Sequence, residues 1–416
     1  IRLYGPQLLP GGDAVLFTVA QETQWDNAQI VVQSLETGER SVLVNGGSDA
    51  RYLATGHIVY AFEDGLLAVA FDPDSLTLSG GPVSLVQGIA RASSAQTGVA
   101  HYAVSDNGTL VAVRGLEQGR LVVWVDRQGV EEELGMAPQF YRQIALSPQG
   151  DRVAVTVRDG NEADLWVHDI RSGVPRRLTF NPEEEAHPTW TPDGTRIAYM
   201  TPGGIAWTAA DGTGQPEILY AGSAGVDTSN LYPDSFTPDG GQLVFEGSGE
   251  TGWDLNLLDL DGERGMRSLI AFEDSQEFAQ VSPDGRWIAY QSNETGRSEI
   301  FVSPFPNVEG GKFQISTDGG VNVRWSPDSR TIYFRDQRSF YSVAVAETEP
   351  AFAWEPPTEF LLGNVYVQAA FSYDVHPDGE RFLILTEGRN ADGSGSPQLI
   401  VVQNWFEEIR RLAPTD

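Results

Sequence analysis

Three acidic segments of the chain carry side chains that could bind a cation or a polar ligand. They are residues 183–187 (Glu-Glu-Glu-Ala-His), 227–230 (Asp-Thr-Ser-Asn) and 273–277 (Glu-Asp-Ser-Gln-Glu). Carboxylate and amide oxygens suit hard cations such as Ca²⁺, and a nearby histidine adds a titratable group. The candidate contact residues in these segments are Glu183, Glu184, Glu185, His187, Asp227, Asn230, Asp274 and Glu277. The alternative is that the acidic loops are only solvated.

Metal and cofactor binding has weak support. The five histidines show none of the spacings of metal motifs. Residues 259–263 (Asp-Leu-Asp-Gly-Glu) resemble the start of a calcium loop, but the ligand series does not continue through Gly265, Met266 and Arg267. This segment fits a tight turn as well. We expect no cofactor, with Ca²⁺ as the open alternative.

No catalytic motif is visible, so we predict no catalytic residues and a protein that is not an enzyme. Neither a Gly-x-Ser-x-Gly elbow nor the His-Arg-Asp and Asp-Phe-Gly motifs of kinases occur in the chain. Residues 247–252 match the glycine pattern of dinucleotide-binding loops, but the next segment, 253–257, reads as a strand where that motif needs a helix. We interpret this stretch as a hairpin loop.

Composition narrows the possible partners. The chain has 416 residues, 40% of them hydrophobic, no cysteine, and a formal net charge of −31. A surface this acidic repels nucleic-acid phosphates, so we expect no nucleic-acid binding. No apolar run is long enough to cross a bilayer, so we expect no membrane insertion by this chain. The first residues lack the features of a signal peptide. The chain starts in the middle of a repeat, so we expect a mature product or a fragment.

The elements that position these side chains belong to a repeat. Residues 281–292 read as a strand, a Pro-Asp-Gly turn and a second strand that is mostly apolar. Related turns recur at steps of roughly 40 to 50 residues, the period of a propeller blade. They begin at residues 10, 106, 148, 192, 238, 283, 327 and 377, with a degenerate version at 54.

Each repeat contains four short antiparallel strands, and no segment between repeats has helical periodicity. This pattern predicts an all-β fold, a β-propeller of four-stranded blades with about nine repeats. The expected repeats are 1–46, 47–92, 93–137, 138–182, 183–224, 225–272, 273–317, 318–364 and 365–416. They form one large ring or, alternatively, a partial ring (1–137) and a six-bladed ring (138–416).

The last repeat differs from the others. After the strand at 397–402, Trp405, Ile409 and Leu412 have the spacing of a short amphipathic helix. This helix replaces a fourth strand or covers the exposed edge, because a ring needs its ends sealed. We expect the C-terminal segment to pack on the first repeat.

The repeats resemble the TolB-type, WD-like propeller repeat. Residues 190–199 (Trp-Thr-Pro-Asp-Gly-Thr-Arg-Ile-Ala-Tyr) carry this resemblance. The order of the repeats is similar to the C-terminal propeller region of bacterial eukaryotic-like serine/threonine kinases, with 8–17, 251–255, 303–306 and 400–405 as the matching stretches. The resemblance implies a bacterial sensor or interaction domain on the extracytoplasmic side, in the periplasm or at the cell surface. The kinase part is missing.

One column of residues is expected to line the propeller axis. It stands three positions before each turn and faces a wetter environment than the following residue, because strand side chains alternate. Its members are Gln7, Ala103, Ala145, Thr189, Ser235, Gln280, Arg324 and Asp374. Arg324 and Asp374 belong to consecutive repeats, so they could form an ion pair across the interface or anchor a ligand.

Together these patterns favour a non-enzymatic propeller that binds a protein or a small polar ligand at its variable loop face. Two alternatives stay open. The first is a propeller enzyme, a metal-assisted polysaccharide lyase or hydrolase. The second is a structural protein that self-assembles, as a homo-oligomer at a surface.

Overall fold

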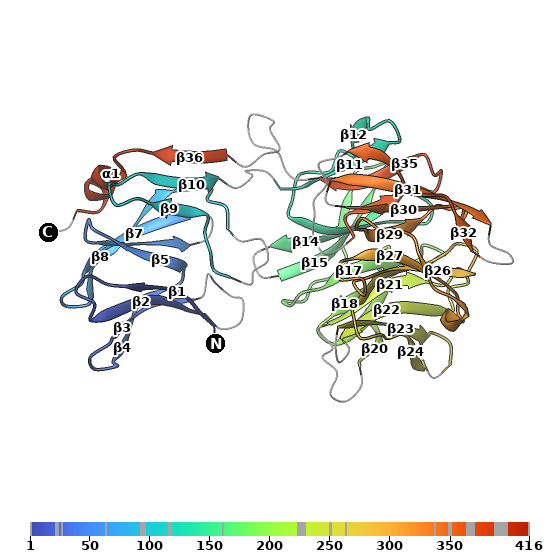
Figure 1. Ribbon diagram of the computed structural model, residues 1–416, viewed down its shortest axis with the longest axis horizontal. Helices are drawn as coiled ribbons and strands as arrows, with labels where there is room; N and C mark the ends of the chain where they lie inside the picture. The colour runs from blue at the N-terminus through green and yellow to red at the C-terminus, as the bar shows by residue number, and fades with distance from the viewer. Residues whose placement is uncertain are drawn as a thin grey trace. The chain divides into compact units, whose positions relative to one another are not determined.

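The computed structural model describes residues 2–20, 25, 28–62, 65–91, 97–114, 119–159, 162–222, 230–248, 252–262, 264–336, 338–347, 352–362, 371–386 and 398–414. The chain divides into two compact units. Unit 1 comprises Ile1–Gln118 and Arg389–Asp416, and unit 2 comprises Gly119–Gly388. In the described residues, nine β-sheets and one short C-terminal α-helix form (Figure 1). The prediction of an all-β fold with about nine four-stranded repeats is thereby confirmed.

The recurring turn is built by a hydroxyl and a carboxylate. At 282–287 the Ser282 Oγ donates to Asp284 Oδ1 (2.6 Å) and accepts the N–H of Trp287 (3.0 Å). Gly285 has a φ of 71°, a conformation that glycine adopts without steric cost. The turns at Thr237 and Ser326 repeat the hydroxyl–carboxylate bond. These residues therefore serve the fold, because they fix the hairpin that starts each sheet.

In its described part, unit 2 contains six sheets. Five are formed by consecutive strands. These are β13 (Tyr141–Leu146), β14 (Arg152–Asp159), β15 (Glu162–Asp169) and β16 (Pro175–Arg177); β17 (Ala186–Trp190), β18 (Arg196–Thr201), β19 (Gly204–Ala209) and β20 (Glu217–Tyr220); β21 (Leu231–Phe236), β22 (Gln242–Ser248), β23 (Trp253–Asp259) and β24 (Met266–Ile270); β25 (Gln276–Val281), β26 (Trp287–Ser292), β27 (Glu299–Pro304) and β28 (Phe313–Gln314). The fifth has β29 (Val321–Trp325), β30 (Thr331–Arg335), β31 (Ser339–Glu347), β32 (Ala353–Trp354) and β33 (Thr358–Leu362).

The sixth sheet closes the ring by joining strands from both ends of the unit. β11 (Leu121–Asp126) and β12 (Glu131–Glu133) pair with β35 (Arg381–Thr386) and β34 (Tyr373–Val375). The inner strand β34 of this sheet contacts β13 on one side and β29 on the other. Unit 2 is therefore a closed six-sheet ring, with apolar clusters packed between neighbouring sheets.

Unit 1 contains three sheets in its described residues. The first has β1 (Arg2–Leu8), β2 (Ala14–Ala20), β3 (Gln29–Ser34) and β4 (Arg40–Asn45). The second has β5 (Ser48–Leu53), β6 (His57–Phe62), β7 (Gly65–Asp72) and β8 (Thr77–Val86). The third combines β9 (Tyr102–Val104) and β10 (Leu110–Arg114) with the late strand β36 (Gln398–Val402), drawn in red beside β10 in Figure 1.

The strand pairing differs from the expected repeats at two places. The strands of 93–137 and of 365–416 are each divided between two sheets, one in unit 1 and one in unit 2. The compact units accordingly change at 118/119 and 388/389, and not at 137/138 as in the two-ring alternative. The physical reason is that the ring of unit 2 would otherwise leave strand edges unpaired. Its first strand, β11, therefore pairs with its late strand β35 and closes the ring.

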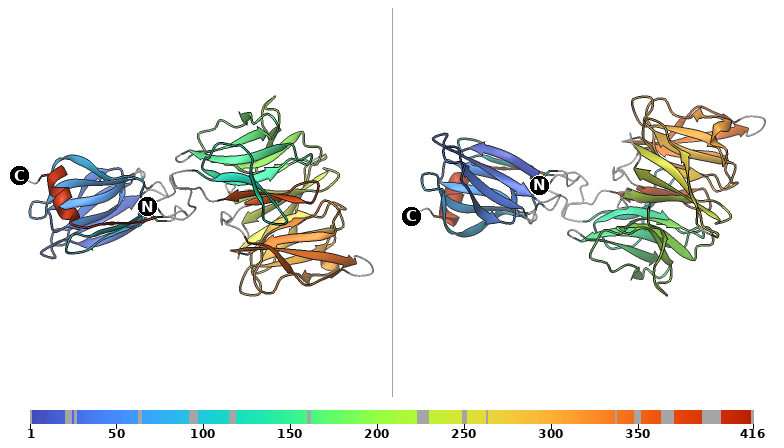
Figure 2. Two further views of the ribbon diagram at one scale, coloured as in Figure 1. Left: turned by 90° about the horizontal axis from the view of Figure 1, so that it is seen from above. Right: turned by 90° about the horizontal axis from the view of Figure 1, so that it is seen from below.

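The C-terminal helix forms as predicted, but its packing site differs from the expectation. α1 (Trp405–Leu412) buries Trp405 and Ile409. These side chains join an apolar cluster with residues of the second and third sheets, such as Leu66 and Leu110, and not with the first sheet. Figure 2 shows the red helix against the blue strands of unit 1. The third sheet has three strands. α1 contacts β8 of the second sheet, and the N–H of Trp405 donates to the Gly108 carbonyl in the turn between β9 and β10 (2.8 Å).

None of the helices in the described ranges is long and apolar enough to cross a membrane.

Candidate binding site on the axis of unit 2

The axis of unit 2 contains a channel with a volume of about 400 Å³. Each of the six sheets contributes its innermost strand and the proline of its hairpin turn to the lining. The lining includes the predicted column, Ala145, Thr189, Ser235, Gln280, Arg324 and Asp374, and the prolines 148, 192, 238, 283, 327 and 377. The predicted position of this column is therefore confirmed for unit 2.

The column also forms hydrogen bonds between neighbouring sheets. The N–H of Trp325 donates to Oε1 of Gln280 (2.6 Å), and the N–H of Val281 donates to the Ser235 hydroxyl (3.2 Å). In unit 1, the N–H of Tyr52 donates to Oε1 of Gln7 in the same way (2.7 Å). A side chain on one inner strand thus satisfies a backbone donor on the next, at a place where an unpaired donor would be costly.

Arg324 and Asp374 form the predicted ion pair, with 3.2 Å between Nε and Oδ1. Asp374 also accepts the N–H of Leu146 at 2.9 Å, so its carboxylate bridges β29, β34 and β13. The Arg324 guanidinium lies 3.6 Å from the centre of the Phe371 ring. This pair joins the closing sheet to both of its neighbours, which gives it a structural role. Its role as a ligand anchor stays a prediction.

A buried carboxyl pair beside the channel was missed by the sequence analysis. Asp234 on β21 and Glu246 on β22 are both buried and close enough for each to affect the pKa of the other. Burial raises the pKa of Asp234 to about 8, and burial together with the Asp234 charge raises the pKa of Glu246. Glu246 Oε1 accepts the N–H of Phe278 in the next sheet (2.6 Å). In the sequence, the one sign of this pair is Glu246, a carboxylate that directly follows the apolar residues Leu243–Phe245 of a predicted strand.

His187 lies at a bulge in β17 with a φ of 58°. Its ring is half-buried and stacks on Tyr232 of the next sheet, with 4.2 Å between ring centres. Burial and the nearby Arg142 charge lower the pKa of His187 to about 3. The imidazole is therefore neutral at physiological pH and available as a hydrogen-bonding group.

The three glutamates before His187 do not act as one cluster. Glu183 is exposed, while Glu184 forms an ion pair with Arg142 of the preceding sheet. Glu185 is buried, and its Oε1 accepts a hydrogen bond from Asn181 at 2.7 Å. Burial raises the pKa of Glu185. Only Glu183 and Glu184 are placed to meet a partner.

The remaining predicted residues lie near the starts of β21 and β25. Asn230 Oδ1 accepts from the Tyr232 hydroxyl (3.2 Å), and Asp274 is half-buried before β25. Glu277 accepts from Gln291 at 3.1 Å, and burial raises its pKa. Asp227 lies outside the described residues. The described candidates thus come from three neighbouring sheets of one ring, at the strand ends opposite the hairpin turns.

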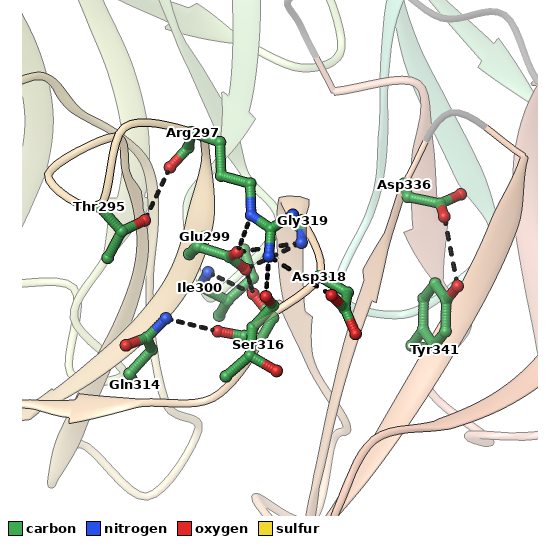
Figure 3. A network of polar contacts seen from close by, with 11 residues as sticks. Thr295, Arg297, Glu299, Ile300, Gln314, Ser316, Asp318, Gly319, Asp336 and Tyr341 are labelled. Atoms are coloured by element: carbon green, nitrogen blue, oxygen red, sulfur yellow. Dashed lines mark hydrogen bonds and ion pairs between the residues drawn. The ribbon is translucent and has the colours of Figure 1, made fainter.

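A polar network around Glu299 looks like a catalytic arrangement but is built into the sheet (Figure 3). The Ser316 hydroxyl donates to Glu299, and the N–H of Ile300 donates to that same hydroxyl at 2.9 Å. Arg297 pairs with Glu299 at 2.7 Å. The sheet of β13–β16 repeats this pattern with Asp164, Thr179 and the N–H of Leu165. Its recurrence indicates that it fixes the outer strand to the third strand.

Among the described residues, no group of three or more histidine, aspartate or glutamate side chains is arranged to hold a metal ion.

Comparison with known proteins supports the fold assignment. No family model matches the chain. A stretch of 86 residues is 33% identical to the Tol-Pal system protein TolB of Anaeromyxobacter dehalogenans (strain 2CP-C), covering 20% of each protein. Another match is 26% identical over 155 residues to the uncharacterized peptidase YuxL of Bacillus subtilis (strain 168), covering 36% of this chain and 21% of that protein. The chain thus spans about a fifth of the length of these relatives.

A solved structure resembles the chain more extensively. The structure of a putative TolB from Agrobacterium tumefaciens has a TM-score of 0.50 and 16% sequence identity, covering 65% of this chain and 98% of that one. The fold is a TolB-type β-propeller, so this part of the predicted resemblance is confirmed. The finer resemblance to the propeller region of bacterial kinases stays a prediction.

Proposed function

We propose that this protein is a non-enzymatic interaction module that binds a segment of a protein partner at the axial channel of unit 2. The observation that carries the proposal is the channel itself, about 400 Å³ in volume and lined by all six sheets. Its turn-side rim consists of prolines, which offer a rigid surface at little entropic cost on binding. We place its action on the extracytoplasmic side of a bacterium, in line with the sequence resemblance.

The charge of the molecule sets the expected kind of partner. A formal net charge of −31 favours encounter with basic or neutral segments and disfavours acidic ones. At the opposite strand ends, Glu183 and Glu184 extend this acidic character. A polar segment with a basic residue is therefore the ligand class that fits best, and a small polar ligand of the same charge would use the same groups.

The test combines crosslinking with channel-filling variants. A photo-reactive amino acid at the exposed Gln149, beside the proline rim, should capture the partner from a bacterial envelope extract. Ala145→Arg should abolish capture, because the long side chain fills the channel. Ala145→Gln is the matched control, since Gln280 occupies the equivalent place in another sheet.

A double variant tests the strand ends that lie opposite the hairpin turns. The double charge reversal Glu183→Lys and Glu184→Lys should weaken capture by removing electrostatic attraction, and should do so less at high salt. Capture at Gln149 that survives Ala145→Arg would overturn the assignment of the channel as the binding site.

A further inference from the structure

The axial channel of unit 2 has an open end at the hairpin turns and a closed end inside the ring. The turn prolines line the open end, and Pro148, Pro238 and Pro283 are exposed there. Phe371 lines the other end. Among the described residues, the candidates at the opposite strand ends, such as Glu183, do not belong to the lining. The cavity therefore ends at the level of Phe371.

Two phenylalanine rings and an arginine form the closed end. Phe278 and Phe371 are both buried, with 5.3 Å between their ring centres. Phe278 belongs to β25 and Phe371 precedes β34, and the inner strand β29 lies between these two in the ring. Since Phe371 lines the channel, this contact between non-neighbouring sheets crosses the axial space. The Arg324 guanidinium on β29 lies against Phe371, and we call these three side chains the axial plug.

The backbone holds both rings of the axial plug in place. The Phe371 carbonyl accepts the N–H of Ile144 on β13 at 3.2 Å. Phe278 stands at the bulge of β25 with a φ of 53°, a conformation that bulky residues rarely adopt. Its N–H donates to Glu246 of the neighbouring sheet at 2.6 Å. A partner segment therefore cannot thread through the channel, and the group that reaches the closed end belongs to a chain end or to one side chain.

Asp234 supplies an unsatisfied acceptor towards the closed end. It stands one position further from the turn than Ser235 of the column, lines the channel, and is 8% exposed. Its Oδ2 has no hydrogen-bond partner in the described part of the chain. A buried carboxylate oxygen without a partner is costly, so a donor from a ligand would stabilise it. The charged groups that act on Asp234 are Glu246 on β22, Glu277 on β25 and Arg324 on β29.

The charges at the closed end favour a cation. Two of the three groups around Asp234 are acidic, and the third, Arg324, is already engaged. Its Nε pairs with Asp374 at 3.2 Å, and its Nη1 donates to the Val323 carbonyl at 3.3 Å. A carboxylate ligand would have to displace Asp374. A single unpartnered oxygen suits a compact ammonium group better than a guanidinium, whose planar fork matches two acceptors.

We propose that the closed end of the channel binds a primary ammonium group, with Oδ2 of Asp234 as its hydrogen-bond acceptor. The group comes from the free amino terminus of the partner or from a lysine side chain. This inference rests on the proposed function of the channel and specifies which part of the partner enters it. The volume of about 400 Å³ lies near the lower end of the usual range for ligand sites, about 300–1,000 Å³, and suits a short insertion.

Binding of defined peptides tests the proposal. The full chain is dialysed to equilibrium against randomised tetrapeptide amides that contain no lysine, and mass spectrometry measures the retained peptides. A second library is the same but acetylated, and a third is acetylated and carries one lysine. The free-amine library, the lysine library or both should be retained at least about tenfold more than the acetylated lysine-free library, because a hydrogen bond to a charged group has this strength. The two ammonium libraries distinguish the two sources.

Asp234→Asn keeps the shape of the side chain but removes its charge, so it should abolish the preference for ammonium. Asp254→Asn is the matched control, because Asp254 is a half-buried carboxylate of the same sheet outside the lining. Circular dichroism shows whether each variant is folded.

Three outcomes would overturn the inference. They are no retention of either ammonium library, equal retention of all three libraries, and an ammonium preference that survives Asp234→Asn. Equal retention that Ala145→Arg abolishes would leave the channel as a binding site without its ammonium selectivity. The proposed function itself fails on a different result, which is partner capture at Gln149 that survives Ala145→Arg.

Discussion

At the scale of single residues, Asp234 in the channel lining and the nearby Glu246 are two buried carboxyls. Both pKa values are raised by burial, and the N–H groups of Phe278 and Ala279 stabilise the pair without neutralising it. Two buried carboxyls in contact cannot both be ionised at low cost, so the pair retains a proton at neutral pH. Oε1 of Glu246 accepts the N–H of Phe278, so this carboxyl is anchored to the next sheet.

This arrangement predicts that the protein becomes less stable as pH rises. The unfolded carboxyls lose their protons near pH 4, whereas folded Asp234 has a pKa of about 8. Between these values the folded state holds a proton that the unfolded state has released, so the free energy of unfolding falls as pH increases. Glu246→Gln, which mimics the protonated acid, should flatten the decrease in urea unfolding measured at pH 5, 7 and 9.

The control for this experiment is Glu162→Gln, because Glu162 is exposed on β15. It should leave the pH dependence of the wild type unchanged. If Glu246→Gln showed the same slope as the wild type, the shared proton would be wrongly assigned.

The sequence predicted the contacts of those residues whose position in the fold follows from their place in the repeat. Arg324 and Asp374 occupy the same place in consecutive repeats, so their pairing followed from the alignment. Asp234 and Glu246 were missed because they stand on different strands of one sheet and only strand pairing brings them together. The run Glu183–Glu185 does not form one surface, because Glu185 is buried with Asn181 while Glu184 pairs with Arg142.

At the scale of elements, inner strands are joined by side chains that accept backbone hydrogen bonds across the sheet interfaces. Apolar stacking alone does not fix the height of one sheet against the next. A hydrogen bond from Trp325 N–H to Gln280 does, because its geometry tolerates little sliding. The residues of the column therefore fix the position of each sheet relative to its neighbour, and they also line the channel.

Gln280→Ala should lower the free energy of unfolding by about 1–3 kcal/mol, the usual cost of leaving a buried donor unpaired. Chemical denaturation of the full chain measures this change. Gln128→Ala is the control, since Gln128 is exposed in a turn, and it should change stability by less than about 0.5 kcal/mol. Equal effects of the two variants would contradict the role given to the column.

At the scale of the whole molecule, the repeat period predicted the sheets but not their grouping. Seven sheets are made from consecutive strands, so local turn and strand patterns were sufficient for them. The other two combine strands more than 200 residues apart, such as β11 with β35 (Leu121 with Thr386). No local pattern distinguishes a strand that pairs with its neighbour from one that pairs with a distant segment.

The two units should respond separately to damage in the C-terminal helix. Trp405 is almost fully buried against the second and third sheets of unit 1. Trp405→Ala should cost about 3–5 kcal/mol in unit 1. Hydrogen exchange at one fixed protein concentration should accelerate in β10 and β36 and stay unchanged in β22. Glu407→Gln on the exposed helix side is the control, and faster exchange in both units would contradict their independence.

The position of β36 also has a consequence for biosynthesis. It completes a sheet begun by β9 and β10, yet all of residues 119–388 lie between them in the chain. During translation, the edge of β10 stays unpaired until unit 2 has left the ribosome. Because domains fold as they emerge, unit 2 should reach its native state first. The unpaired edge of β10 then depends on chaperones for protection against aggregation in the interval.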